Sequence, residues 1–196
     1  MATHFIIDIE TMGAKSAASA ITSIACVPID FDNLQDFDYY MKNGFLAKIN
    51  WVDQIKNKTH VTESGTVDWW KRQPLDAQNK SIVPHSTDLL LHDALERLNK
   101  YVRSFVDYDF KSSWFWSRGI AFDFPKLEYS FGICKVSSPI NTFMLRDIRT
   151  MVDCFTGSAN GRYLLQTPPA NFVKHCALSD AAYDAAAMVE IYKENL

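Results

Sequence analysis

The 196-residue sequence lacks the features that mark several broad classes of protein. No stretch approaches the ~18 consecutive apolar residues of a membrane-spanning helix, so no membrane association is expected. The beginning of the chain has no basic patch followed by an apolar run, which argues against a secretory signal. Basic residues are not in excess either, because 20 Lys and Arg stand against 23 Asp and Glu, a net charge of −3. That balance argues against a protein that simply coats nucleic acid through a basic surface.

Cysteine pairs are also absent. The four cysteines, Cys26, Cys134, Cys154 and Cys176, are scattered and form no CxxC motif. We interpret them as reduced thiols of a cytoplasmic protein rather than as a disulfide framework or a zinc site. The 47% of hydrophobic and 22% of charged residues are typical of a globular protein. The length suits one domain, which we expect to cover residues 1–196.

The pattern of residue types predicts strands first and helices later. Residues 3–9, 20–29 and 36–42 are rich in β-branched and aromatic residues and predict three successive strands. Small residues from Gly13 onward suit a tight connection between the first two strands. Three strands in succession predict an antiparallel meander. The elements expected after it are helices over 51–56, from near Thr66 to before Pro74, over 87–105, 123–131 and 179–195, a strand over 112–117 and a loop over 160–170.

The clearest of these helices is the one over 87–105. Leu91, Leu95 and Leu98 recur there at helical spacing, and Thr87 or Asp88 can cap its beginning. A meander followed by alternating helices and strands predicts an α/β fold, with a mixed sheet flanked by helices, rather than a purely parallel doubly wound sheet.

Two carboxylates stand at the end of the first predicted strand. Asp8 and Glu10 are two residues apart, so their side chains point to the same face, whereas Ile9 between them points into the core. Acidic groups so close to an apolar strand need a partner. Hydrolysis of a phosphodiester by two divalent cations ~3.5–4 Å apart requires carboxylates of this kind from several elements. Taken alone, such a pair is more often an ordinary surface feature.

A second group of polar residues lies near the C-terminus. His175 and Asp180 are five positions apart, with Asp180 at the beginning of the last predicted helix. Separately, the histidine has the ordinary interpretation of a partly buried residue, and the aspartate that of a helix-capping acid. Asp184 follows one turn later, and we expect it to be a partner of the site or a solvated charge rather than a further ligand.

Together these motifs resemble the DEDD superfamily of 3′→5′ exonucleases, in its histidine-containing (DEDDh) branch. The motifs are Asp8-Ile9-Glu10, an FD pair that ends at Asp123, and an HxAxxD element from His175 to Asp180. They occur in the family's order across almost the whole chain. The resemblance implies a ribonuclease H-like fold.

The resemblance also assigns roles to these residues. Asp8, Glu10, Asp123 and Asp180 would be the metal ligands for two ions of Mg²⁺ or Mn²⁺, with Asp8 bridging both. His175 would be the general base that takes a proton from the attacking water, which suits a side chain whose reference pKa is about 6.5.

The same resemblance indicates residues that contact the substrate. Thr11 would hydrogen-bond the 3′-terminal nucleotide, and Met12 would form an apolar wedge against its base. Arg118 and Phe122 complete the expected substrate-binding residues; Arg118 could meet a phosphate or lie solvated in a loop. Proofreading members usually carry Asn four residues before the central aspartate, where this sequence has Gly119, so the nucleotide pocket departs from the family's pattern at this position while the metal site does not.

Three segments resemble a phage-centred subgroup of the exodeoxyribonuclease A type. They are IIDIETMG, the TVDWWKRQ segment with Trp69 and Trp70, and RDIRT over 146–150. A tryptophan can stack on a base, which is worth ~1–3 kcal/mol in single-strand binding. Because adjacent helical residues point in different directions, we expect at least one of Trp69 and Trp70 to belong to the core.

The sequence therefore predicts a metal-dependent 3′→5′ exodeoxyribonuclease that acts on single-stranded or frayed DNA and releases nucleoside 5′-monophosphates. An exoribonuclease with the same site is the alternative, because a contact to the 2′-OH cannot be recognised. An inactive nucleic-acid-binding module is disfavoured by the complete set of site residues. A Mg²⁺-dependent phosphatase would use Asp8 as a covalent nucleophile and would not need His175.

The resemblance implies a partner as well as an activity. That partner is nucleic acid with a free 3′ end, with DNA favoured over RNA by the phage-type segments. A homodimer is an arrangement that related trimming enzymes often adopt. The compartment expected is the cytoplasm, which would be that of the host for a viral protein.

Overall fold

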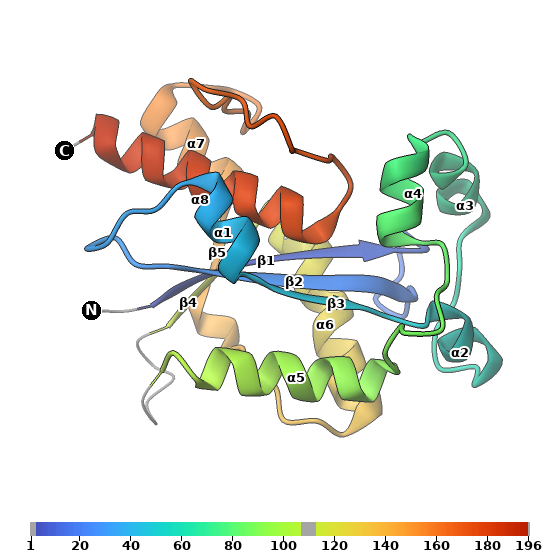
Figure 1. Ribbon diagram of the computed structural model, residues 1–196. Helices are drawn as coiled ribbons and strands as arrows, with labels where there is room; N and C mark the ends of the chain where they lie inside the picture. The colour runs from blue at the N-terminus through green and yellow to red at the C-terminus, as the bar shows by residue number, and fades with distance from the viewer. Residues whose placement is uncertain (1–2, 107–112, 196) are drawn as a thin grey trace.

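A computed structural model describes residues 3–106 and 113–195 of the chain (Figure 1). Its centre is a five-stranded sheet with the order β3-β2-β1-β4-β5. Strand β1 (His4–Thr11) pairs antiparallel with β2 (Ile21–Ile29), and β2 pairs antiparallel with β3 (Phe45–Lys48). On the other side, β4 (Trp114–Ser117) is parallel to β1, and β5 (Leu145–Asp147) is parallel to β4. The predicted mixed sheet is confirmed, with β1 at its centre.

The predicted third strand over 36–42 is wrong. Helix α1 (Phe37–Asn43) occupies that segment, and β3 follows it directly. The Asp36 side chain caps the helix by accepting a hydrogen bond from the Tyr39 N–H at 2.9 Å. Phe37 and Tyr40, one turn apart, are both buried, which is the helical rather than the strand period. The meander persists, but with a helix inside its second connection.

The remaining helices confirm all five predicted helical segments, one with the predicted bounds of 51–56 and four with shifted ends. The segments predicted as helical are α2 (Trp51–Lys56), α3 (Ser64–Trp70), α5 (Leu91–Arg103), α6 (Ile120–Cys134) and α8 (Ala177–Glu194). Three elements were not predicted, namely α4 (Leu75–Ser81), the short 3₁₀ helix η2 (Thr142–Met144) and α7 (Ile148–Thr156), together with strand β5.

Several predicted helix ends differ from the structure. Helix α5 begins at Leu91, so neither Thr87 nor Asp88 caps it, and Asp88 instead accepts a hydrogen bond from the His85 N–H at 2.8 Å. Helix α3 begins before Thr66. The strand predicted over 112–117 is β4 from Trp114, and its first predicted residue lies outside the described residues. Local sequence places these elements but not their ends, which depend on tertiary packing.

Helices cover both faces of the sheet (Figure 1). One core lies between the sheet and helices α8, α1 and α7, and the other lies between the sheet and helices α5 and α6. In β1, Ile6 belongs to the first core, whereas Ile7 and Ile9 belong to the second. Helices α2, α3 and α4 gather beyond the C-terminal end of β1. Among the described residues, no helix is long and apolar enough to cross a bilayer.

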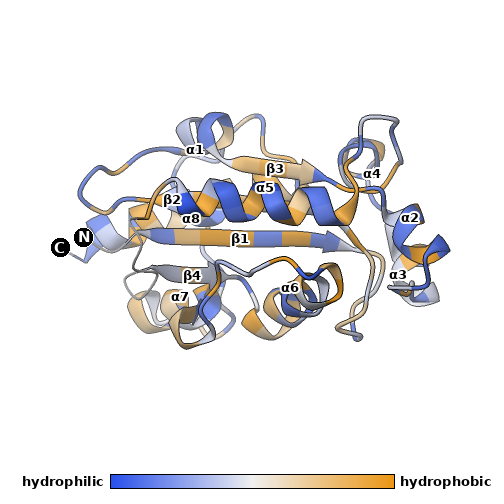
Figure 2. Cartoon of the chain, turned by 90° about the horizontal axis from the view of Figure 1, so that it is seen from below, coloured by the Kyte–Doolittle hydropathy of each residue, from blue (hydrophilic) through white to orange (hydrophobic). Residues whose placement is uncertain are grey.

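The hydropathy of β1 changes along its length (Figure 2). The strand is mainly hydrophobic where it crosses the sheet and hydrophilic toward its C-terminal end. Its polar end therefore lies between the helices that cover the two faces and close to the α2–α4 group.

Matched substitutions test the core on the α5 side. Leu98 is fully buried and Leu75 is 76% exposed, although both are helical leucines. We expect Leu98→Ala to lower the free energy of unfolding by about 2–5 kcal/mol, and Leu75→Ala to change it by less than about 0.5 kcal/mol. Urea unfolding of both variants measures the difference, and equal losses would contradict this assignment of the core.

Candidate active site

Two acidic side chains point from the end of β1 toward helix α8. Asp8 and Glu10 share the strand face of Ile6, which packs in the α8-side core. The pairing of β1 with β2 shifts register between Glu10 and Thr11, so the regular ladder ends at the second acid. The predicted convergence of the two carboxylates on one face is confirmed by this arrangement of the strand.

The third acid comes from the first turn of α8. Asp180 accepts a hydrogen bond from the His175 N–H at 2.7 Å. His175 itself has a positive φ of 64°, a left-handed conformation that costs a non-glycine residue energy. This turn directs the imidazole back toward the acids, and one ligand atom each of Glu10, His175 and Asp180 lie within 4.8 Å of one another.

The fourth acid reaches the same place from the opposite face of the sheet. Asp123 lies in the first turn of α6 and is only 4% exposed. Its carboxylate accepts the Ile9 N–H at 3.4 Å, a backbone group that lies between the two β1 acids. Helix α6 begins after Gly119, whose φ of 137° allows the sharp turn out of β4.

Burial and mutual repulsion shape the electrostatics of this cluster. Burial, followed by the charge of Glu10, raises the pKa of Asp8 well above its ordinary value, and the charges of Asp180, Asp123 and Asp184 add to the effect. Burial and then the charge of Asp180 raise the pKa of Glu10. Burial is also the main cause that raises the pKa of Asp123 and that of Asp180 to about 7. The positive charge near the four carboxyl groups is too small for all four to be ionised together.

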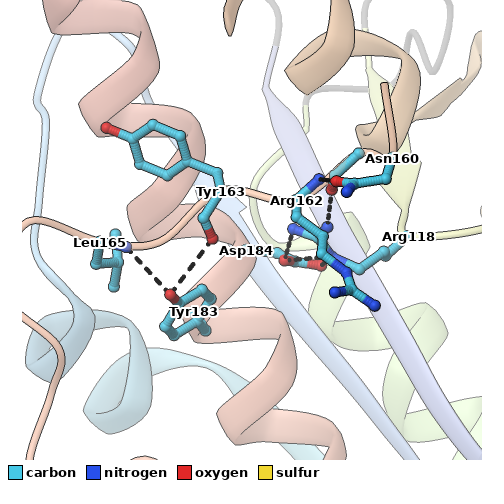
Figure 3. A network of polar contacts seen from close by, with 8 residues as sticks. Arg118, Asn160, Arg162, Tyr163, Leu165, Tyr183 and Asp184 are labelled. Atoms are coloured by element: carbon cyan, nitrogen blue, oxygen red, sulfur yellow. Dashed lines mark hydrogen bonds and ion pairs between the residues drawn. The ribbon is translucent and has the colours of Figure 1, made fainter. Parts of the chain in front are cut away.

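A fifth acid is already neutralised by an arginine (Figure 3). Asp184 is buried, and it accepts hydrogen bonds from Arg118 Nε at 2.8 Å and 3.1 Å and from Arg118 Nη2. The remaining guanidinium nitrogen of Arg118, Nη1, donates to the Gly161 carbonyl. Asp184 is therefore a partner of the site, as expected, and not a solvated charge.

Two tryptophan rings pack against the ring of His175. The ring of Trp69 meets the His175 ring edge-on with centroids 4.8 Å apart, and that of Trp70 does so at 6.4 Å. The His175 carbonyl accepts a hydrogen bond from Ser81 Oγ at 2.6 Å. Burial lowers the pKa of His175, and the charge of Lys174 lowers it further. The imidazole is thus neutral at neutral pH and able to accept a proton.

The tryptophan pair divides its roles. Trp70 is 1% exposed, packs with Met12 and Ala20, and donates from Nε1 to the Thr11 carbonyl at 2.9 Å. Trp69 is only partly buried and faces the site. At least one member of the pair therefore belongs to the core, as predicted.

A groove of about 1670 Å³ runs over the acids. Of the residues predicted to bind substrate, Thr11, Arg118 and Phe122 line it, whereas Met12 is buried and packs beneath it. The Thr11 hydroxyl donates to the Gly13 carbonyl at 2.7 Å. The roles of all four in substrate binding stay predictions, and Met12 would have to move to form a wedge. The groove is also lined by the basic residues Lys15, Arg149, Arg162 and Lys174.

Two residues near the groove were not predicted. Lys126 is 2% exposed, and its ammonium donates to the carbonyls of Phe122 and Ala14 and so ties α6 to the segment after β1. Glu63 accepts the N–H groups of Ala14, Lys15 and Ser16 and fixes the same segment. For Lys126, its position three residues after Asp123 was a signal in the local sequence. Nothing local identified Glu63, because its partners lie far earlier in the chain.

Oxygen donors and an excess of buried negative charge fit hard divalent cations. The charges of all four other acids raise the pKa of Asp8, so Asp8 lies within reach of each of them. Of the five acids, Arg118 pairs with Asp184 alone.

Comparisons with known proteins identify the family of the chain. A family model described as "3'-5' exoribonuclease Rv2179c-like domain" matches residues 3–192. The exodeoxyribonuclease of Enterobacteria phage T4 is 30% identical over 207 aligned residues, which cover 94% of this chain and 86% of that protein.

Solved structures share the fold at low sequence identity. The nuclease domain of 3'hExo, a DEDDh family member bound to rAMP, aligns with a TM-score of 0.64 at 12% identity over 98% of this chain and 92% of its own. E. coli Exonuclease I in complex with a dT13 oligonucleotide has a TM-score of 0.64 at 15% identity over 98% of this chain, which spans 41% of that longer protein. The solved structures therefore confirm the predicted ribonuclease H-like fold, and the family model and the phage relative show that the chain belongs to the 3′–5′ exonucleases of the Rv2179c-like family.

Proposed function

We propose that this exonuclease is a 3′→5′ exodeoxyribonuclease that acts on single-stranded or frayed DNA and releases nucleoside 5′-monophosphates. The observation that carries the proposal is that Glu10, His175 and Asp180 converge within 4.8 Å and line one groove together with Asp8 and Asp123. The family normally uses divalent metal ions. Two ions of Mg²⁺ or Mn²⁺ would be held by Asp8, Glu10, Asp123 and Asp180, and when bound they would neutralise charge that develops on the phosphate.

His175 is proposed as the general base. Its lowered pKa leaves the imidazole ready to accept a proton from the attacking water. The contacts to Trp69 and Ser81, and the hydrogen bond from its own N–H to Asp180, restrict its position. A base held in this way loses little freedom when the substrate binds, which favours proton transfer along one direction.

DNA is proposed as the preferred polymer because of the phage relative. That protein is named an exodeoxyribonuclease and is similar over nearly the whole chain. RNA is the second candidate, favoured by the family model, whose description names an exoribonuclease. The site itself is compatible with both polymers, since the metal ions held by the carboxylates would meet the phosphate and not the sugar.

Residues 1–196 are proposed to form one exonuclease domain, which the match over residues 3–192 supports. All four cysteines are free, which supports the proposal of a reducing cytoplasmic compartment, that of the host for a viral protein. A homodimer stays a prediction, and so does the role of Thr11, Met12 and Phe122 at the 3′-terminal nucleotide.

Digestion of 5′-labelled oligonucleotides tests the proposed activity. We expect Mg²⁺- or Mn²⁺-dependent shortening from the 3′ end, faster on DNA than on RNA and stopped by EDTA. Asp8→Ala should abolish it, because the central ligand is lost. His175→Ala should lower kcat by about 10²–10⁴, the usual contribution of a general base. His92→Ala, an exposed histidine on α5, is the matched control and should keep the rate of the unmodified protein.

The outcomes separate the candidates. Internal cutting, or activity that survives EDTA, would overturn the exonuclease mechanism. Faster digestion of RNA would replace the first candidate by the second. If His175→Ala kept a phosphatase activity while the chain degraded neither polymer, Asp8 would instead be a covalent nucleophile.

The raised carboxyl pKa values predict how metal and pH act on stability. Asp123 and Asp180 have a pKa of about 7 in the folded protein but about 4 in the unfolded chain. Between pH about 4 and about 7 the folded state therefore binds more protons than the unfolded chain. The metal-free protein consequently loses stability as the pH rises through this range. Bound cations should remove this penalty, so Mg²⁺ should raise the unfolding temperature more near pH 8 than near pH 6.

Thermal unfolding with Mg²⁺ or with EDTA at both pH values measures the effect. Asp180→Asn should flatten the pH dependence and reduce the rise caused by metal. Asp93→Asn, which removes an exposed acid on α5, should change neither. An unfolding temperature that does not respond to Mg²⁺ at either pH would contradict the assigned metal site.

A further inference from the structure

Three arginines, Arg118, Arg149 and Arg162, line the groove, and they differ in how far their guanidinium groups are engaged inside the protein. Arg118 donates from Nε and Nη2 to Asp184 and from Nη1 to the Gly161 carbonyl, so its charge and most of its donors are used inside the protein. Arg149 is exposed in the same groove and donates no hydrogen bond to the described residues. It belongs to the RDIRT segment, which contributes none of the proposed metal ligands and not the proposed base.

Two glycines leave the space in which the Arg149 side chain runs. Gly161 has a φ of 63°, and a Cβ placed on it would lie 2.4 Å from the Arg149 Cβ. Gly119 has a φ of 137°, and a Cβ there would lie 3.1 Å from Arg149 Nη1. The side chain therefore runs past one glycine and ends beside the other, at the beginning of α6. Any larger residue at Gly161 would displace it.

Polar contacts fix the ends of this path. Asp147 caps α7 by accepting the Thr150 N–H at 2.9 Å, and it also accepts the Ile120 N–H of α6 at 3.4 Å. Asp153, one turn after Arg149, accepts the Gly161 N–H at 2.6 Å. The base of Arg149 is thus held in place before any substrate arrives, which reduces the entropy lost on binding.

The charge environment indicates the ligand. The Arg149 charge acts on Asp184, which lies about one helical turn along α8 from the metal ligand Asp180. Asp184 is already paired with Arg118, so the Arg149 guanidinium remains available for an anion. Phosphate suits it, since the planar guanidinium binds phosphate oxygens through two parallel hydrogen bonds. The neighbouring Arg162 and Lys174 extend a positive rim along the groove.

We propose that Arg149, rather than Arg118, binds a phosphodiester of the substrate strand outside the metal site, namely the first one on the 5′ side of the scissile bond. This inference rests on the proposed function. Metal ions held by the four carboxylates would take the scissile phosphate, and Arg149 lies in the same groove, with its guanidinium beside the beginning of α6, where it would meet the neighbouring phosphate. It would secure the register of the strand without touching the reacting atoms.

Binding of single-stranded DNA at several salt concentrations tests the contact. In an Asp8→Ala background, which holds the strand uncut, Arg149→Ala should weaken binding by about tenfold or more. It should also reduce the slope of log K against log salt by about 0.7, the value for one phosphate of a single strand. Arg149→Lys should keep the slope but recover only part of the affinity. Arg97→Ala, an exposed arginine on α5 outside the groove, is the control and should keep both.

A chemical substitution identifies the phosphate. A neutral methylphosphonate between the second and third nucleotides from the 3′ end should weaken binding to the Asp8→Ala protein by the same factor as Arg149→Ala. It should cause no further loss in the Asp8→Ala/Arg149→Ala protein, because the same contact is removed once. Additive losses, or an unchanged salt slope, would overturn the inference.

Failure of this inference differs from failure of the proposed function. If the unmodified protein shortens DNA from the 3′ end while Arg149→Ala binds it with an unchanged slope, only the role of Arg149 is wrong. If the unmodified protein degrades no 3′ end, the proposed function itself fails. Thermal unfolding of Arg149→Ala and of Arg149→Gln checks that both fold, as expected for an exposed side chain.

Discussion

Repulsion among buried carboxylates is the constraint around which this molecule is organised. Asp8, Glu10, Asp123 and Asp180 come from three elements on both faces of the sheet and meet at the end of β1. Their pKa values rise because burial and neighbouring charge both oppose ionisation. Such a cluster weakens the folded state and is compensated by the two hydrophobic cores, which hold β1 between α8 and α6.

The surrounding polar contacts decide which negative charges stay available. Arg118 neutralises Asp184 and leaves the four family carboxylates for cations. Lys126 lies close enough to Asp123 to lower its pKa somewhat, yet donates its hydrogen bonds to backbone carbonyls. The positive charge beside the acids is therefore smaller than the negative charge, which suits the cluster to the metal ions proposed for it. A site with an ion pair for every acid would have no reason to bind one.

Position in the backbone matters as much as charge for the histidine and for Arg149. The left-handed turn at His175 and the positive φ values of Gly119 and Gly161 place side chains where regular strands or helices could not. Tertiary contacts over-determine these conformations, through Asp180 and Ser81 at the histidine and Asp153 at Gly161. The side chains of His175 and Arg149 are thereby set in the positions that their proposed roles need, at the cost of local strain.

The sequence by itself determined the central strand, the order of the motifs and the chemistry of the site. Period-two alternation placed Asp8 and Glu10 on one face, and the spacing from His175 to Asp180 identified the C-terminal element, because both depend only on local geometry. Segment 36–42 was wrong because its aromatic residues suit a strand as well as a helix, and the decisive features were a capping bond at Asp36 and packing on α8.

Only the tertiary structure decided how the remaining charges pair. Nothing in the sequence distinguishes Arg118 from Arg149. Arg118 forms an internal ion pair because α8 brings Asp184 to it. The short elements β5 and α7 escaped prediction because β5 depends on its pairing with β4 and α7 on its packing against α8. Local patterns thus specify which groups can act, whereas contacts between distant segments determine which of them remain free to meet the substrate.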